Sequence, residues 1–269
     1  MGEPLISVIV PTYNRAALLR RTLASILEQS YTKIETIVVN DAGEYPLVEG
    51  LDVMAFYSSS QDKVFNYFEN KENKGLAGTR NVAMSFATGD YFVFLDDDDI
   101  LLPYALEFRM YMMKKLNAEI VYTRALQDIW EKREQGYVSV HKKLYWDSLF
   151  HKDLILIQNI APCCCPMFSR KAWNDSGNHK FDEEMTTSED HNFWIELSRT
   201  TDFHELKLID AECSYRQDLT QMTGTLDFSP NWIKIFKRWR HTAIDLDWVT
   251  KHQNNILRSA GIDPEEHGL

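Results

Sequence analysis

The sequence lacks an excess of positive charge. Its 269 residues include 29 Lys and Arg against 40 Asp and Glu, which gives a net charge of -11 at pH 7. Because sequence-independent binding to nucleic acid needs clustered Lys and Arg, the composition argues against DNA or RNA as a partner. It still allows a small anionic ligand that a few local cations hold.

Long apolar runs are also missing. No window approaches the roughly 20 apolar residues of a membrane-spanning helix. The first residues, Met1 to Pro4, lead directly into a strand-like run and show no signal-peptide pattern. We therefore expect a cytoplasmic protein, either dissolved or held at the inner face of the membrane.

Cysteine is scarce, and three of the four cysteines are consecutive at 163–165. If Cys163, Cys164 and Cys165 lie on a strand, they alternate between its faces and do not form a simple bridged framework. Their spacing also lacks the paired pattern of a zinc site. We interpret them as reduced thiols.

What the sequence does contain is a series of short apolar, β-branched runs separated by helix-period segments. Such runs are typical of strands buried on both faces of a parallel sheet. The predicted strands are 5–10, which ends before Pro11, then 35–40, 64–68, 91–95 and 119–123. The predicted helices follow residue 14, cover 75–88 and extend from about 103 to 116. This alternation predicts an α/β fold with a mostly parallel central sheet flanked by helices.

The second half of the chain is less regular. Residues 124–160 are predicted as helix and loop, 162–168 as a strand and 190–199 as a helix. From about residue 226 the pattern changes to a helical tail rich in Trp and Lys.

Polar residues follow three of the predicted strands. They are Pro11, Thr12, Tyr13 and Arg15 after the first strand, Asp41 after the second, and the run Asp96–Asp99 after the strand at 91–95. Ligands of open α/β sheets bind beyond the carboxyl ends of the strands. If these strands are parallel, the three loops meet at one edge of the sheet.

The four consecutive aspartates repel one another at close range, and a divalent cation relieves that repulsion. Mg²⁺ and Mn²⁺ prefer carboxylate oxygens and commonly share them with substrate phosphates. Asp96 and Asp98 should point to the same side if the segment stays extended. A solvated acidic turn is the alternative, but the buried strand before the run and the neighbouring loops favour a metal site.

Two other segments have both a structural and a functional interpretation. Gly75 and the small residues after it permit close approach of a ligand, and Arg80 suits either a phosphate or a surface salt bridge. Glu189 and Asp190 begin a predicted helix, where acidic residues are usually only capping groups.

Five segments, in order and in spacing, resemble the inverting family 2 glycosyltransferases, whose fold is called GT-A. They are SVIVPTYNR (7–15), IVVNDAG (37–43), ENKGLAGTRN (72–81), GDYFVFLDDDDILLP (89–103) and FDEEMTTSEDHNFWIEL (181–197). The resemblance covers roughly residues 4–225. It implies a Rossmann-like GT-A catalytic domain over 1–225, with a nucleotide-sugar half at about 1–123 and an acceptor half at 124–225, followed by a helical extension at 226–269.

The resemblance also implies a reaction. A hexosyl or N-acetylhexosaminyl group would pass from a nucleoside diphosphate sugar, first of all a UDP-sugar, to a hydroxyl of a saccharide or lipid-linked acceptor. Mn²⁺ or Mg²⁺ is the implied cofactor.

Each residue that matches a family motif takes a role from the resemblance. Pro11, Thr12, Tyr13 and Arg15 match the nucleoside pocket, Asp41 the carboxylate that reads the base, Gly75 the donor loop and Arg80 a diphosphate contact. Asp96, Asp97 and Asp98 occupy the D-x-D position, and Asp98 and Asp96 are the expected metal ligands. Because Asp97 replaces the small middle residue of many relatives, it stays open which two aspartates touch the ion. Asp190 matches the general base, and Glu189 matches a residue that helps to position the acceptor.

The tail has two interpretations. Trp232, Phe236 and Trp239 fall on one helical face with Lys and Arg around them. Residues 232–240 could therefore contact a membrane surface, or the tryptophans could pack on the catalytic domain.

Other functions remain as alternatives at this point. A sugar nucleotidyltransferase usually has a Gly-rich loop after the first strand, but this loop is PTYNR. A dinucleotide-dependent dehydrogenase would need G-x-G-x-x-G there. A non-catalytic or partner-dependent domain of a larger enzyme would have no need for both the Asp run and Asp190.

Overall fold

The computed structural model describes residues 2–43, 63–133, 136–144, 149–216 and 229–269. The strands are β1 (Ile6–Thr12), β2 (Ile34–Asn40), β3 (Lys63–Glu69), β4 (Tyr91–Phe94), β5 (Ile100–Leu101), β6 (Ile120–Arg133), β7 (Gly136–Leu144), β8 (Pro166–Ser169) and β9 (His204–Arg216). The helices are α1 (Ala16–Leu27), α3 (Gly75–Phe86), α4 (Ala105–Leu116), α5 (Arg170–Asp175), α6 (Glu189–Ser198), α8 (Ser229–Trp239) and α9 (Leu246–Ser259), with short 3-10 turns at η1 (Leu154–Leu156), η2 (Arg240–Thr242) and η3 (Glu265–His267).

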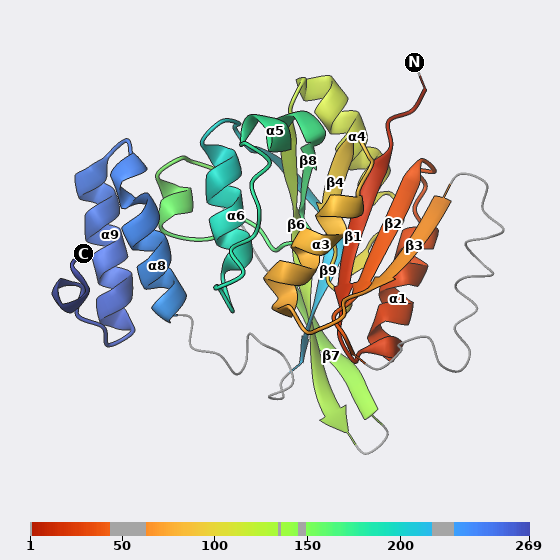
Figure 1. Cartoon of the computed structure of the whole chain (residues 1–269), viewed down its shortest axis with the longest axis horizontal. Coiled ribbons are helices and arrows are strands. Elements are labelled where there is room, and N and C mark those ends of the chain that lie inside the picture. The colour runs from red at the N-terminus through yellow and green to blue at the C-terminus, as the bar shows by residue number, and fades with distance from the viewer. Residues whose placement is uncertain (1, 44–62, 134–135, 145–148, 217–228) are drawn as a thin grey trace.

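The described strands form one nine-stranded sheet in the order β3-β2-β1-β4-β8-β6-β9-β5, with β7 paired to β6 (Figure 1). β1, β2, β3, β4, β6 and β9 run in one direction, and β5, β7 and β8 run in the other. The predicted α/β fold with a mostly parallel sheet and flanking helices is confirmed. The antiparallel strands, β5, β7 and β8, all lie on the side of β4 away from β1.

β1 is longer than its sequence predicted. It continues through Pro11 and Thr12, which pair with Val39 and Asn40 of β2. On its other side, β4 pairs with β1 only as far as Ile9. Proline therefore lies where its missing N–H interrupts no ladder with β4, and the prediction that the strand ends before Pro11 is wrong.

The prediction of helix and loop for residues 124–160 is also wrong over its first half. β6 continues to Arg133, and β7 pairs back along it as an antiparallel partner. β6 also pairs in parallel with β9, between Val121–His204 and Trp130–Arg216. Because that partner lies far along the chain, the local composition of the segment did not reveal the strand.

The cysteine run lies in a turn before β8 rather than on a strand. The amide of Cys165 donates to the carbonyl of Pro162 at 3.0 Å, and β8 begins only at Pro166. Cys163, Cys164 and Cys165 are all buried, and none of the three forms a disulfide.

Aromatic side chains fix α6 against the sheet. Phe193 and Trp194 of α6 lie with ring centroids 5.6 Å and 5.9 Å from that of Phe94 on β4. Both rings also pack on Phe168 of β8. This cluster sets the position of the first turn of α6, which carries Glu189 and Asp190.

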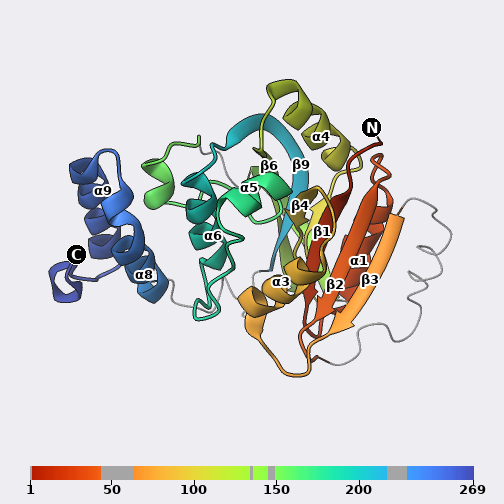
Figure 2. The same ribbon diagram turned by 45° about the horizontal axis from the view of Figure 1, so that its top comes forward.

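The C-terminal helices α8 and α9 lie at the opposite end of the molecule from β3, with α6 between them and the sheet (Figures 1 and 2). Phe236 is 1% exposed and Trp239 is 7% exposed. Phe236 and Trp239 thus pack on the protein, as the second interpretation of the tail expected, and a membrane contact through residues 232–240 stays a prediction. Within the described residues, no helix combines the length and the apolar character needed to cross a membrane. The expected boundary at 225/226 lies outside the described residues, and the division into halves stays a prediction.

Candidate active site

A cavity of about 910 Å³ extends from the carboxyl ends of β1, β2 and β4 to the C-terminal helices. The predicted site residues that line it are Pro11, Thr12, Tyr13, Arg15, Asp41, Gly75, Arg80, Asp96, Asp97, Asp98, Glu189 and Asp190. The loops after β1, β2 and β4 meet at one edge of the sheet, as their parallel direction predicted, and α3 and α6 add the other residues, whose roles stay predictions.

The loop after β2 is tied to the start of α3. Asp41 is 4% exposed, and its Oδ1 accepts from the backbone N–H of Lys74 and from the amide of Asn70, both at 2.8 Å. Gly75 has φ +70°, a conformation that favours glycine, and an added Cβ there would meet no atom within 4 Å. Backbone conformation, rather than close approach, explains this glycine.

The aspartate run forms a tight turn and is not extended. The amide of Asp99 donates to the carbonyl of Asp96 at 3.0 Å, and the hydroxyl of Thr22 on α1 donates to the carbonyl of Asp99 at 2.8 Å. Asp96 and Asp98 consequently have different partners. Asp98, with Asp97, contacts Arg15.

Arg15 and Thr12 bind the middle of this turn. Arg15 Nη1 lies 3.1 Å from Asp97 Oδ1 and 3.1 Å from Asp98 Oδ2. Thr12 donates to Asp97 Oδ2 at 2.7 Å. Burial, with some repulsion from Asp98, raises the pKa of Asp97 to about 6, although Arg15 and Thr12 act in the opposite direction.

The donor set of this turn suits a divalent cation. Carboxylate oxygens of Asp96, Asp97 and Asp98 face a cavity, and Asp97 is costly to ionise where it lies. Among the described residues, no group of three or more His, Cys, Asp and Glu is arranged to hold a metal ion by itself. The arrangement fits an ion that is bound partly by these carboxylates and partly by phosphates of a ligand, as Mg²⁺ commonly is.

Arg80 is buried and pairs with two carboxylates, so it does not form the surface salt bridge that the sequence left open as an alternative. Its side chain is 1% exposed, and its guanidinium lies 2.6 Å from Asp96 Oδ1 and 2.6 Å from Glu189 Oε1. It therefore joins α3, the aspartate turn and α6. Arg80 and Glu189 also line the cavity, so a bound ligand could reach them. The expected contacts of Arg80 with a diphosphate and of Glu189 with an acceptor stay predictions.

Asp190 lies at the first turn of α6, beside the cavity. Its Oδ1 accepts from the backbone N–H of His191 at 2.7 Å, and its Oδ2 accepts from the amide of Asn159 at 2.8 Å. Burial raises the pKa of Asp190, while Arg80 and these two hydrogen bonds lower it. A carboxyl group with a raised pKa is better matched to accepting a proton near neutral pH.

Sequence reasoning missed several residues of the cavity wall. They are Gln127, Gln158, Asn159, Thr186, Thr187, Trp232 and Ile256. Asn159 lies in the segment 124–160, whose sequence has no regular hydrophobic pattern, so no local signal indicated its role. Trp232 did stand out, but as part of a basic amphipathic helix.

A Rossmann-like half-sheet, an aspartate turn at its carboxyl edge and a cavity that continues to α6 are the features of GT-A glycosyltransferases. The sequence profile described as Glycosyl transferase family 2 matches residues 7–175. The chain belongs to this family.

Two curated relatives illustrate the range of similarity. An uncharacterised glycosyltransferase of Rickettsia felis is 30% identical over 203 residues, which are 75% of this chain and 32% of the relative. The UDP-Glc:alpha-D-GlcNAc-diphosphoundecaprenol beta-1,3-glucosyltransferase WfgD of Escherichia coli is 33% identical over 123 residues, or 45% of this chain and 46% of that protein. The chain spans between 29% and 61% of the length of the first curated relatives that it matches.

Solved structures confirm the fold. S. aureus TarS 1–349 in complex with UDP-GlcNAc has a TM-score of 0.70 at 16% identity, over 96% of this chain and 73% of that one. The mannosyltransferase PcManGT from Pyrobaculum calidifontis, in complex with GDP-Man and Mn²⁺, has a TM-score of 0.61 at 15% identity, over 97% of this chain and 76% of that one.

Proposed function

We propose that the chain transfers a hexosyl or N-acetylhexosaminyl group from a UDP-sugar to an acceptor hydroxyl, with inversion at the anomeric carbon. The observation that carries this proposal is the single cavity that holds the loops after β1 and β2, the aspartate turn and Asp190. The UDP-GlcNAc complex of TarS and the UDP-Glc donor in the name of WfgD support a uridine nucleotide.

The nucleoside would lie over Pro11, Thr12, Tyr13 and Asp41, which line one end of the cavity. Tyr13 is 49% exposed, so its ring is accessible to a base. Asp98 and Asp96 would hold Mn²⁺ or Mg²⁺, which when bound would neutralise charge on the departing diphosphate. The Mn²⁺ complex of PcManGT supports a metal of this kind.

Asp190 would accept the proton of the attacking hydroxyl. The hydrogen bonds from His191 and Asn159 hold its carboxyl group in place, and Glu189 would help to orient the acceptor. The hydroxyl would attack the anomeric carbon from the face opposite the nucleotide and displace it directly, so no covalent intermediate with the protein would form. The name of WfgD gives that enzyme a lipid-linked acceptor, and we extend the proposal to a saccharide, either free or lipid-linked.

The test is a thermal-shift screen of UDP, GDP, CDP, dTDP and ADP, with and without Mn²⁺. A ligand that binds only the folded state raises the melting temperature. We expect a Mn²⁺-dependent rise with UDP that Asp98→Asn loses and that Asp263→Asn, an acidic residue outside the cavity, retains. A rise in melting temperature with a different nucleotide would assign that nucleotide to the donor in place of UDP. No rise with any nucleotide would contradict the proposal.

Catalysis needs its own measurement. Incubation with UDP-sugars and glycoside acceptors should yield a product whose anomeric configuration, read by NMR, is opposite to that of the donor. Asp190→Asn should bind UDP normally but lose transfer. Nucleotide binding without any transfer in the wild type would instead support a non-catalytic or partner-dependent domain.

A further inference from the structure

The cavity continues beyond the segment that the family profile matches. Trp232 of α8 and Ile256 of α9 line it together with residues of the nucleotide end. Both side chains are half-buried and pack against the apolar core. The C-terminal helices are therefore part of the wall of the cavity.

The wall at this end is mixed in character. Ile157, Ala161 and Pro162 add apolar surface beside Trp232 and Ile256. Polar groups lie between them, namely Gln158, Asn159, Thr186, Thr187 and Ser188. Asn159 has a further feature: its Oδ1 is buried and has no hydrogen-bond partner among the described residues.

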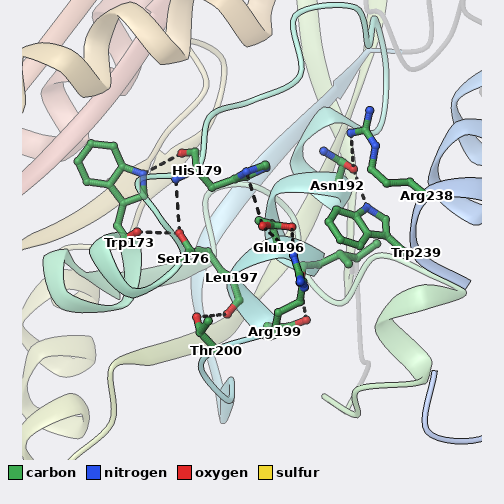
Figure 3. Close-up of polar contacts among 12 residues, drawn as sticks. Trp173, Ser176, His179, Asn192, Glu196, Leu197, Arg199, Thr200, Arg238 and Trp239 are labelled. Atoms are coloured by element: carbon green, nitrogen blue, oxygen red, sulfur yellow. Dashed lines mark hydrogen bonds and ion pairs between the residues drawn. The ribbon is translucent and has the colours of Figure 1, made fainter. Parts of the chain in front are cut away.

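Polar contacts hold α8 firmly against α6 (Figure 3). Trp239 Nε1 donates to Asn192 Oδ1 at 2.8 Å, and Arg238 donates to the same oxygen at 3.2 Å. Arg199, which follows α6 and donates to Glu196 of that helix, lies over the Trp239 ring at 5.3 Å from its centroid. These contacts are on α6, the helix that carries Asp190.

α9 is anchored to the segment that carries Asn159. Gln253 is fully buried and donates to the carbonyl of Leu156 at 2.9 Å. The carboxylate of Asp153 accepts the backbone N–H groups of Ile244 and Asp245 just before α9, at 2.6 Å and 2.9 Å. Trp232 and Ile256 thus have fixed positions relative to Asp190 and Asn159.

We propose that Trp232 and Ile256 form the outer wall of the acceptor subsite, and that this subsite receives a pyranose ring. The inference rests on the proposed function. The apolar C–H face of the sugar would lie on Trp232, while its hydroxyls would contact Asp190 and the polar groups of this wall. An aromatic ring beside amide and carboxylate groups provides both kinds of contact that a sugar offers.

The alternation of apolar and polar groups favours a sugar over a lipid chain. A lipid chain would need a continuous apolar trough, because each buried polar group without a partner costs free energy. Along this wall, Asn159 and residues 186–188 interrupt the apolar surface. Sugar hydroxyls can instead hydrogen-bond to these polar groups.

The experiment measures binding of the methyl glycosides of glucose, galactose, mannose and N-acetylglucosamine to the full chain saturated with UDP and Mg²⁺. Saturation-transfer NMR detects which ring protons contact the protein. We expect at least one glycoside to bind the wild type, Trp232→Ala to weaken it about tenfold, and Trp232→Phe to recover most of the loss. Ile256→Ala should weaken binding as well, with a smaller effect.

Two controls separate this inference from folding defects and from the proposed function. Trp248→Ala removes a tryptophan of the same extension that is 39% exposed and does not line the cavity, so it should leave glycoside affinity within about twofold. UDP affinity should also be unchanged in all four variants.

If UDP binds but no glycoside binds the wild type, or if Trp232→Ala and Ile256→Ala bind glycoside as tightly as the wild type, the acceptor wall is wrong and the donor site stands. If UDP does not bind the wild type, the proposed function fails and this inference fails with it.

Discussion

Arg80 joins α3, the aspartate turn and α6, and its side chain is only 1% exposed. Its guanidinium pairs with Asp96 and Glu189. Arg80→Met would leave both carboxylates without their cation. Loss of one partner from a buried pair costs about 3–5 kcal/mol, so we expect a large fall in the free energy of unfolding, measured in urea.

Two comparisons sharpen this prediction. The exposed pair Lys171–Asp175 is the matched control, and Lys171→Met should leave the unfolding midpoint almost unchanged. Adding Glu189→Gln to Arg80→Met should recover part of the loss, because one unpaired charge is then removed. An Arg80→Met protein as stable as the wild type would show that the pairs contribute little.

Asn159 acts on Asp190 through one hydrogen bond, and that bond favours the ionised carboxylate. Asn159→Leu removes the donor at nearly constant volume, so the pKa of Asp190 should rise. The acidic limb of the pH profile of kcat/KM should therefore move upward.

The pH profile distinguishes positioning from a general structural role. A variant that is merely less well folded would lose activity at every pH and keep the same acidic limb. An unchanged limb in Asn159→Leu would therefore contradict the assignment of Asp190 as the base that Asn159 holds.

At the scale of elements, His191 connects α6 to the 3-10 turn η1. Its Nε2 lies 2.6 Å from the carbonyl of Ile155, and burial lowers its pKa to about 4. The unfolded chain binds a proton near pH 6.5, whereas the folded chain stays neutral until about pH 4. Stability is therefore fully present above pH 6.5 and is lost as the pH falls toward 4.

The measurement compares wild type with His191→Gln in urea at pH 8 and pH 5. The wild type should lose about 2 kcal/mol relative to the variant over this range. Taking the difference between the two proteins removes the contribution of Asp97, whose raised pKa acts with the opposite sign. A difference that is constant with pH would mean that His191 titrates normally.

Elements defined by local patterns could be predicted, and elements defined by remote partners could not. β1, β2 and β4 are apolar runs whose composition alone indicates burial on both faces, and their loops gave most of the site. The start of β6 was also predicted, but its continuation to Arg133 depends on pairing with β9, and β7 in turn pairs with β6. Asn159 and Trp232 reach the cavity only because α6, α8 and η1 pack together, and no spacing in the sequence encodes that packing.

For the whole molecule, the C-terminal extension and the catalytic part share one core. Ile235, Phe236, Val249 and Leu257 are each at most 1% exposed and belong to the same apolar cluster as the sheet. The extension should therefore unfold together with the sheet, and not as an appendage that detaches first.

Trp239→Ala tests this cooperativity. The side chain is 7% exposed, donates to Asn192 and lies under Arg199. Removing a buried tryptophan costs about 3–5 kcal/mol, and because the extension and the sheet share a core, the loss should lower the single unfolding midpoint of the whole chain. Trp248→Ala should change it little, since Trp248 is largely outside the core. Far-UV circular dichroism and limited proteolysis should report the same midpoint. If the variant instead releases a C-terminal fragment at low urea while the rest stays folded, the extension is a separate unit, and its contribution to the cavity would depend on a weak interface.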